Sequence, residues 1–196
     1  MRKIAFFDFD GTITTKDTLL EIIKFQKGKA WFYTGFVLNS PFLIAYKIGL
    51  ISNQTAKELV LRFFFGKTPV DQFQSKCDEF AKAELAGLIR PKAMQEINQL
   101  KNKGFEIVIV SASASNWLRE WTRANGLSLI ATELEVRSQK ITGKIIGKNC
   151  YGEEKVMRIK KDYDLNNCQD IYCYGDTKGD LPMLNLATIK FYKPFR

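Results

Sequence analysis

Three short runs of apolar residues, each ending at polar or glycine residues, stand at the beginning, middle and end of the chain. They cover Ile4–Phe9, Ile107–Val110 and Ile171–Tyr174. Runs of this length between turn-forming residues predict buried strands. Leu129–Glu133 and Ile189–Tyr192 have the same character and are two further predicted strands.

Helical patterns lie between these strands. One runs from Pro91 to Lys103 before Gly104, and another covers Asn116–Asn125, with Ser115 as its expected N-cap. Strands that alternate with such helices are typical of right-handed βαβ units, so we expect an α/β fold with a Rossmann-like parallel sheet. A small hairpin is predicted within 134–146, turning at Ser138 and Gln139.

The segment from about Thr14 to Leu88 interrupts this alternation with helical start signals. Thr18-x-x-Glu21 and Thr55-x-x-Glu58 match capping boxes, and Thr68-Pro69-Val70-Asp71 places a cap before a proline at the first helical position. We therefore expect an all-helical cap at 14–88, inserted into a core formed by 1–13 and 89–196.

Ala30–Tyr46 is a stretch of the predicted cap without any charged residue, and it includes Trp31, Phe36 and Phe42. Its length is at the lower limit for a membrane span, and Asn39-Ser40-Pro41 interrupts it. The sequence favours a buried pair of helices. A membrane-spanning helix, or an apolar surface facing a substrate, a partner or a membrane interface, remain the alternatives.

Composition narrows the range of functions. The chain is 45% hydrophobic and 13% aromatic, which excludes a disordered protein, and its formal charge is +9. Basic residues concentrate between Arg137 and Lys161, but no helix-turn-helix, zinc-finger or RNA-binding signature accompanies them. We interpret this stretch as a solvated basic face that attracts anionic substrates, and expect no nucleic-acid partner.

The absence of histidine excludes Ser-His-Asp and Cys-His nucleophilic pairs and His-ligated zinc. Catalysis would depend on carboxylates, Lys, Ser, Thr, Cys or a metal held by oxygen. The four cysteines form no C-x-x-C pair, and the first residues do not resemble a secretory signal. We expect a protein of the reducing cytoplasm.

Polar residues follow three of the predicted strands. Asp8 and Asp10 follow the first, Ser111 ends the second, and Asp176 follows the third, with Asp180 four residues later. Because the carboxyl ends of parallel strands meet at one edge of the sheet, we expect these side chains to converge. Three acids there would repel one another without a cation.

At these residues the chain resembles the haloacid dehalogenase superfamily, and within it the phosphoserine phosphatase-like branch with a helical cap after the first motif. The four family motifs are matched in order by Asp8-Phe9-Asp10-Gly11-Thr12, Ser111, Lys155 and the segment Gly175-Asp176-Thr177-Lys178-Gly179-Asp180. The resemblance covers nearly the whole chain.

The resemblance implies a Mg²⁺-dependent phosphomonoester hydrolase that acts on a small phosphorylated metabolite. Asp8 would be the nucleophile that forms an aspartyl phosphate, and Asp10 the general acid and base. Ser111 and Lys155 would bind phosphate oxygens. The Mg²⁺ ligands would be Asp8, the Asp10 carbonyl and Asp176, with Asp180 bound directly or through water.

Substrate identity is open at this point. Asp17 stands where phosphoserine phosphatases place an acid that contacts the substrate ammonium, so it is a candidate substrate-binding residue. Ala112-Ser113 departs from the usual Gly-Gly, and no cap arginine aligns with the one that binds the carboxylate. The alternatives are another small or amphiphilic phosphomonoester, such as a phospho-alcohol or lysophospholipid, and a non-catalytic binding module that uses the basic face. The sequence does not indicate an oligomeric state.

Overall fold

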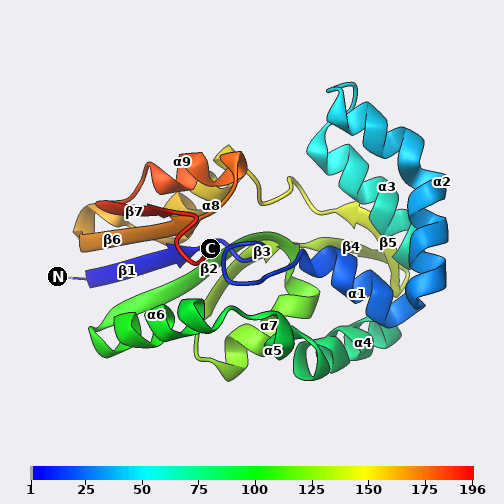
Figure 1. Ribbon diagram of the computed structural model, residues 1–196. Coiled ribbons are helices and arrows are strands. Elements are labelled where there is room, and N and C mark those ends of the chain that lie inside the picture. The colour runs from blue at the N-terminus through cyan, green and yellow to red at the C-terminus, as the bar shows by residue number, and fades with distance from the viewer. Residues whose placement is uncertain (1) are drawn as a thin grey trace.

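A five-stranded parallel sheet forms the centre of the protein (Figure 1) in the computed structural model, which describes residues 2–196. The strand order is β3-β2-β1-β6-β7. The strands are β1 (Arg2–Phe7), β2 (Phe105–Ala114), β3 (Ser128–Thr132), β6 (Cys168–Gly175) and β7 (Ile189–Tyr192). The predicted strands are therefore present, and the α/β class is confirmed.

Helices cover both faces of the sheet. Along β1, Ala5 and Phe7 pack into one apolar cluster, whereas Ile4 and Phe6 pack into another on the opposite face. The first cluster lies under α6 (Pro91–Asn102) and α7 (Ser115–Ala124), and the second under α8 (Glu153–Asp162) and α9 (Leu181–Leu184). The result is a three-layer arrangement with all carboxyl strand ends at one edge.

Helices fill the segment between β1 and α6. They are α1 (Thr18–Lys27), α2 (Lys29–Lys47), α3 (Asn53–Phe65), α4 (Val70–Ala83) and α5 (Leu85–Leu88). The chain enters and leaves this segment side by side, because Thr14 and Ile89 form an antiparallel bridge and the Thr15 amide donates to the Leu88 carbonyl at 2.8 Å.

The predicted hairpin forms β4 (Leu134–Arg137) and β5 (Lys140–Ile145), with Ser138 and Gln139 at positive φ in its turn. β5 packs against α3, so the hairpin adjoins the helical segment. The remaining elements are two short 3₁₀ helices, η1 (Leu165–Asn167) before β6 and η2 (Lys178–Asp180) after it.

The predicted helix caps were wrong by one to three residues. Asp17, and not Thr18, caps α1, because the Thr18 amide donates to Asp10 and its hydroxyl faces Ser113. Ser52 caps α3 in place of Thr55. The first correction comes from tertiary contacts of Thr18 that the local motif does not reveal. The second is local, because the Ser52 hydroxyl accepts from the Thr55 amide at 3.0 Å.

Two further helix starts also differ from the predictions. Pro69 is the N-cap of α4 and not its first residue, because residues 68–69 are extended and pair with β5. Ala114 is the N-cap of α7, whose first residue Ser115 donates to Glu133 at 2.7 Å. The polar side chain of Ser115 thus fixes the loop after β3.

Residues 30–46 lie in one continuous helix, α2, so the expected buried pair of helices was wrong. Pro41 removes the hydrogen-bond donor for the Val37 carbonyl, and the Ser40 hydroxyl replaces it at 2.7 Å. The helix therefore continues through the proline. Much of its apolar surface is exposed.

None of the helices described in residues 2–196 has both the length and the apolar character needed to span a bilayer.

The four cysteines are free, and Cys77, Cys150 and Cys173 are buried.

Candidate active site

Asp8 lies directly beyond the carboxyl end of β1, at the centre of the sheet. Its amide donates to the Tyr174 carbonyl at 2.9 Å, which extends the pairing of β1 with β6. One carboxylate oxygen accepts from Lys155 Nζ at 2.6 Å and the other from the Thr12 hydroxyl at 3.1 Å. Both oxygens of this buried carboxylate are thus held in place.

Lys155, near the start of α8, is only 1% exposed and lies between Asp8 and Asp180. Its Nζ is 2.7 Å from Asp180 Oδ1. Burial alone would lower the pKa of Lys155, but the two carboxylates outweigh it and raise that pKa. The lysine therefore keeps its positive charge at the bottom of the site.

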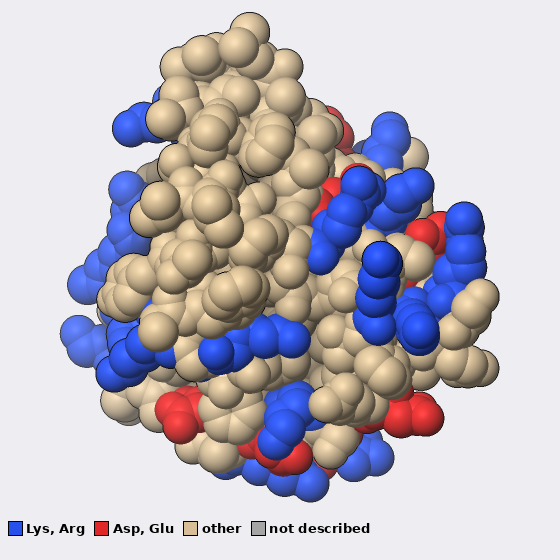
Figure 2. Space-filling model, turned by 90° about the vertical axis from the view of Figure 1, so that its right-hand side faces the viewer, with Lys and Arg blue, Asp and Glu red and all other residues tan. Residues whose placement is uncertain are grey.

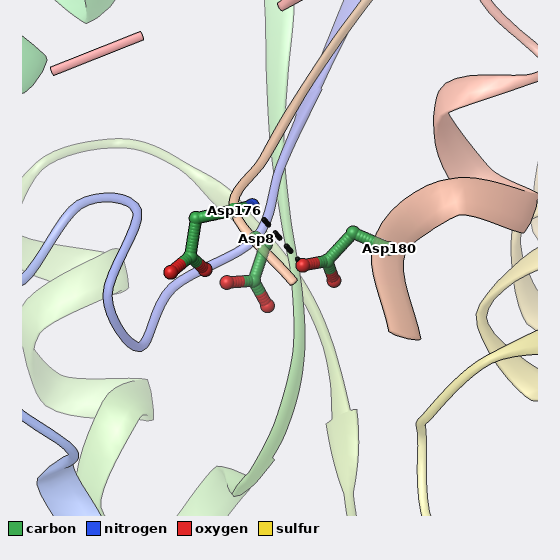
Figure 3. A group of neighbouring side chains, drawn as sticks. All are labelled: Asp8, Asp176 and Asp180. Carbon is green, nitrogen blue, oxygen red and sulfur yellow. Dashed lines mark hydrogen bonds between the residues drawn. The ribbon is translucent and has the colours of Figure 1, made fainter. Parts of the chain in front are cut away.

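The loop after β6 carries Asp176 and Asp180 toward Asp8 (Figure 3). Asp180 Oδ2 accepts from the amides of Asp176 at 3.2 Å and Thr177 at 2.9 Å. The Thr12 hydroxyl lies 3.2 Å from Asp176 Oδ1 as well as near Asp8, and the Arg196 guanidinium donates to Asp176 Oδ2. Asp180 thus shapes the loop that presents Asp176.

Two glycines allow this close approach. A Cβ on Gly11, which has φ of +81°, would lie 2.6 Å from Asp176 Oδ2. A Cβ on Gly175 would lie 2.5 Å from the Asp180 Cβ. Any side chain at either position would push an acid out of the group.

Asp8, Asp176 and Asp180 each offer an oxygen within 4.8 Å of the others, a spacing that suits one cation. Burial raises the pKa of Asp8 to about 7, despite the nearby ammonium of Lys155. Burial likewise raises the pKa of Asp176. A divalent cation among these carboxylates would favour their charged forms, so the donor set fits Mg²⁺.

The carboxylate of Asp10 is held apart from this group. Oδ1 accepts from the Thr18 amide and Oδ2 from the Ser113 hydroxyl, both at 2.6 Å. Trp117 Nε1 donates to Thr18 Oγ1 at 3.0 Å, and the Thr18 and Ser113 hydroxyls are 3.0 Å apart. The Thr18 hydroxyl therefore donates to Ser113, and the Ser113 hydroxyl donates to Asp10.

Ser111 is fully buried in β2, and its hydroxyl oxygen accepts from the Ser113 amide at 3.0 Å. It does not line the cavity above the acids, although its neighbours Ala112 and Ser113 do. The strand thus brings Ser111 to the predicted edge of the sheet, below the cavity surface.

A cavity of about 350 Å³ opens between the acids and the helical segment. Asp8, Asp10, Lys155 and Asp180 lie on its core side, and Asp17 lines it from the start of α1. Asp17 also caps α1, accepting from the Leu19 amide at 2.9 Å. Asp17 is thus both the N-cap of α1 and part of the cavity wall.

Lys57 on α3 is a cavity residue that the sequence analysis did not identify. Its Nζ donates to the Ala112 carbonyl and lies 3.4 Å from Asn149 Oδ1. Burial lowers the pKa of Lys57, although the charges of Asp10 and Asp17 oppose this. No sequence signal separates Lys57 from the other basic residues, whereas Ser113 shares a strand face with Ser111 and could have been found by alternation.

Relatives with known names cover most of the chain. Protein CicA of Caulobacter vibrioides is 34% identical over 192 residues, which is 97% of this chain and 85% of the relative. A probable phosphatase of Mycobacterium tuberculosis is 30% identical over 194 residues, covering 93% of this chain and 66% of the relative.

Solved structures show the same fold. A Bordetella pertussis protein of unknown function superposes with a TM-score of 0.81 at 23% identity, covering 97% of this chain and 89% of the other. A phospho-aspartyl intermediate analogue of phosphoserine phosphatase gives 0.63 at 21% identity, covering 96% and 85%. The model of the haloacid dehalogenase-like hydrolase family matches residues 5–185, and the chain therefore belongs to that family.

Proposed function

We propose that the chain is a Mg²⁺-dependent phosphomonoester hydrolase that works through an aspartyl phosphate on Asp8. The supporting observation is the group of buried acids Asp8, Asp176 and Asp180. The buried Lys155 contacts Asp8 and Asp180, and these three residues line the cavity. A carboxylate attacks a phosphate ester only where the charge of the phosphoryl group is neutralised. This family and this charge arrangement are suited to that reaction.

In the proposed reaction an Asp8 oxygen attacks phosphorus, and the bond to the ester oxygen breaks as Asp10 gives that oxygen a proton. Asp10 then takes a proton from a water molecule that attacks the aspartyl phosphate, which releases inorganic phosphate and restores Asp8. Ser113 and the Thr18 amide hold the Asp10 carboxylate for both proton transfers. Trp117 and the Thr18 hydroxyl fix the direction of the Ser113 hydroxyl.

Lys155 and Ser111 are the proposed ligands of the other phosphoryl oxygens. Lys155 contacts Asp8 at 2.6 Å, so its ammonium would lie beside a phosphoryl group on that residue. The Ser111 hydroxyl oxygen accepts a hydrogen bond from the Ser113 amide, so its own proton is still available for a phosphoryl oxygen.

Asp8, Asp176 and the Asp10 backbone carbonyl are the proposed Mg²⁺ ligands, with Asp180 joined directly or through water. Mg²⁺ in this position would neutralise phosphate charge and orient the ester for in-line attack. The missing Cβ atoms of Gly11 and Gly175 leave room for the acids to converge.

Mg²⁺ should be required for turnover of p-nitrophenyl phosphate, and excess EDTA should reduce the rate to background. Ca²⁺ should inhibit, because its larger and more flexible shell would let Asp8 bind through both oxygens and turn it from the line of attack. Assays with each ion after chelator treatment test this. Full activity in EDTA would contradict the proposal, and no turnover of any phosphomonoester with Mg²⁺ would favour a binding module.

We also propose that residues 14–88 act as a cap over a core formed by 1–13 and 89–196. The paired crossings at Thr14 and Ile89 support this division. One apolar cluster nevertheless joins Phe73 and Phe80 of α4 to Trp117 of α7, so this part of the cap shares the packing of the core. α1 and α3 are tied to the core as well, through the Thr18 hydroxyl beside Ser113 and through Lys57, which donates to the Ala112 carbonyl.

An amphiphilic phosphomonoester is the substrate class that the cavity favours over phosphoserine. Near the acids the cavity is polar, with Asp17 and Lys57. Farther out, apolar side chains of three helices line it, namely Leu19, Leu20, Phe36, Leu43, Ala56 and Val60. Such a wall suits an alkyl or acyl group better than the charged groups of serine.

Lysophosphatidate should be hydrolysed with at least about tenfold higher kcat/KM than glycerol 3-phosphate, because each buried methylene adds apolar contact. The two esters carry the same phosphoglycerol unit and differ in the acyl chain. Phosphate release below the aggregation concentration of the lipid measures the ratio. Equal values, or O-phosphoserine as the better substrate, would contradict this assignment without affecting the proposed chemistry.

A further inference from the structure

The outward face of α2 is apolar, contrary to the usual pattern of a surface helix. Tyr33 is 63% exposed, Val37 70% and Ile44 59%, whereas the polar residue Asn39 is buried. Asn39 satisfies its side-chain amide within the helix, donating to the Gly35 carbonyl at 2.8 Å. The helix thus turns several large apolar side chains outward, while Asn39, a polar residue, lies on its inner side.

The exposed apolar surface continues past the end of α2 into the turn before α3. Ile48 is 66% exposed and Leu50 74% exposed, at the tip of a helical hairpin that projects from the molecule (Figure 1). We call this surface the apolar ridge. Its members are Trp31, Tyr33, Val37, Leu38, Phe42, Ile44, Ile48 and Leu50.

Positive charge accompanies the ridge, and negative charge is absent from the same part of the sequence. Residues 22–57 contain Lys24, Lys27, Lys29, Lys47 and Lys57, but no Asp or Glu. Lys29 and Lys47 stand at the two ends of α2, and within residues 2–196 neither has a carboxylate partner. Figure 2 looks onto this side and shows an uncharged surface bordered by lysines and arginines.

The opposite side of α2 belongs to the cavity. Phe36, Leu43 and Tyr46 line it, together with the acids of the core. One helix thus separates the proposed active site from the ridge, so a surface bound to the ridge would lie beside the cavity.

We propose that the apolar ridge docks on the surface of an anionic lipid bilayer, with α2 lying in the interface. Apolar side chains would enter the boundary of the acyl chains, while Trp31 and Tyr33 suit the headgroup level. Lys29 and Lys47 would contact anionic headgroups. The charge beside the ridge has one sign only, since residues 22–57 contain lysines but no Asp or Glu, and this favours an anionic bilayer as the partner. This proposal does not depend on the phosphatase reaction.

Sedimentation with vesicles tests the proposal on the full chain. The protein should bind vesicles of phosphatidylcholine mixed with phosphatidylglycerol at least about tenfold more tightly than vesicles of phosphatidylcholine alone. The double variant Val37→Asp/Ile44→Asp should lose binding to both kinds of vesicle. Lys29→Glu/Lys47→Glu should lose the preference for the anionic lipid.

Met157→Asp is the matched control, because Met157 is 61% exposed on α8, outside the ridge. It should bind vesicles like the parent protein. Circular dichroism and turnover of p-nitrophenyl phosphate without lipid should be unchanged in all these variants, since none of the substituted residues lines the cavity.

Three results would overturn the proposal. They are no binding to anionic vesicles, equal binding to both lipid compositions, and binding that survives Val37→Asp/Ile44→Asp. Light scattering after size-exclusion chromatography adds a fourth: a dimer that the same double variant dissociates would assign the ridge to a second copy of the chain. None of these four results depends on phosphatase activity, which serves with circular dichroism only as a control, so failure here is separate from failure of the proposed reaction.

Discussion

Replacement of Asp8 by asparagine will abolish the phosphoenzyme and reduce turnover to background. The amide cannot attack phosphorus, and loss of a nucleophile typically costs on the order of 10⁴-fold or more in rate. Acid quenching after incubation with a ³²P-labelled phosphomonoester and Mg²⁺ measures the covalent intermediate. Label that persists in Asp8→Asn would remove Asp8 from its proposed role.

The same variant should remain folded. Asparagine has nearly the shape of aspartate, and Lys155 keeps its contact with Asp180 at 2.7 Å. Burial raises the pKa of Asp8 from 3.8 to about 7 in the metal-free protein. Between these values an unfolded chain releases the proton that the folded chain retains, so the ionised carboxylate costs stability as the pH rises.

At pH 8 with chelator, the melting temperature of Asp8→Asn should therefore equal or exceed that of the parent protein. The rise in melting temperature on adding Mg²⁺ should be smaller, because one proposed ligand is weakened. Asp162→Asn is a suitable control, since Asp162 is an exposed residue at the end of α8. If Asp8→Asn melted well below the parent protein, its lost activity would be explained by misfolding.

The sheet and the acids at its edge could be predicted because their signals are local. An apolar run such as Ile171–Tyr174 marks a strand, and the polar residues that follow must emerge where parallel strands end. The structure accordingly brings Asp8, Asp176 and Asp180 within 4.8 Å of one another.

The helix starts could not be predicted to the residue, because neighbouring side chains can serve equally well as caps. Asp17 and Thr18 both suit the N-cap position. Asp17 occupies it because Thr18 is engaged by Asp10, Ser113 and Trp117, which come from distant parts of the sequence. Only the folded chain decides between them.

The exposure of α2 was also beyond local reasoning, which assigns apolar residues to the interior. α3 offers Phe64 to only one side of α2, where Gly35 approaches so closely that a Cβ would lie 2.3 Å from that ring. No element of residues 2–196 covers the opposite side, so Val37 and Ile44 remain at the surface. Hydropathy alone does not distinguish a helix that is covered by its own protein from one that faces a lipid bilayer or another molecule.

Asp10→Asn should separate the two halves of the reaction, because it removes the proposed proton carrier and leaves the nucleophile. Attack on p-nitrophenyl phosphate should continue, since p-nitrophenolate leaves without needing a proton. Hydrolysis of the aspartyl phosphate should slow by the roughly 10² to 10⁴-fold typical of a lost general base. Rapid mixing should then show a burst of about one equivalent of p-nitrophenolate and a trapped phosphoenzyme sensitive to hydroxylamine.

Ser113→Ala is the informative companion to this variant, because it keeps the Asp10 carboxylate but removes the hydroxyl that donates to it at 2.6 Å. The Thr18 amide still holds the other oxygen, so the carboxylate should lose orientation but not its proton-transfer function. We expect a smaller loss of turnover and no accumulated phosphoenzyme. If Asp10→Asn gave no burst while Asp8→Asn kept one, the two aspartates would have the opposite roles. An equal burst in Ser113→Ala and Asp10→Asn would mean that the orientation of the Asp10 carboxylate, and not only its proton transfer, limits hydrolysis of the aspartyl phosphate.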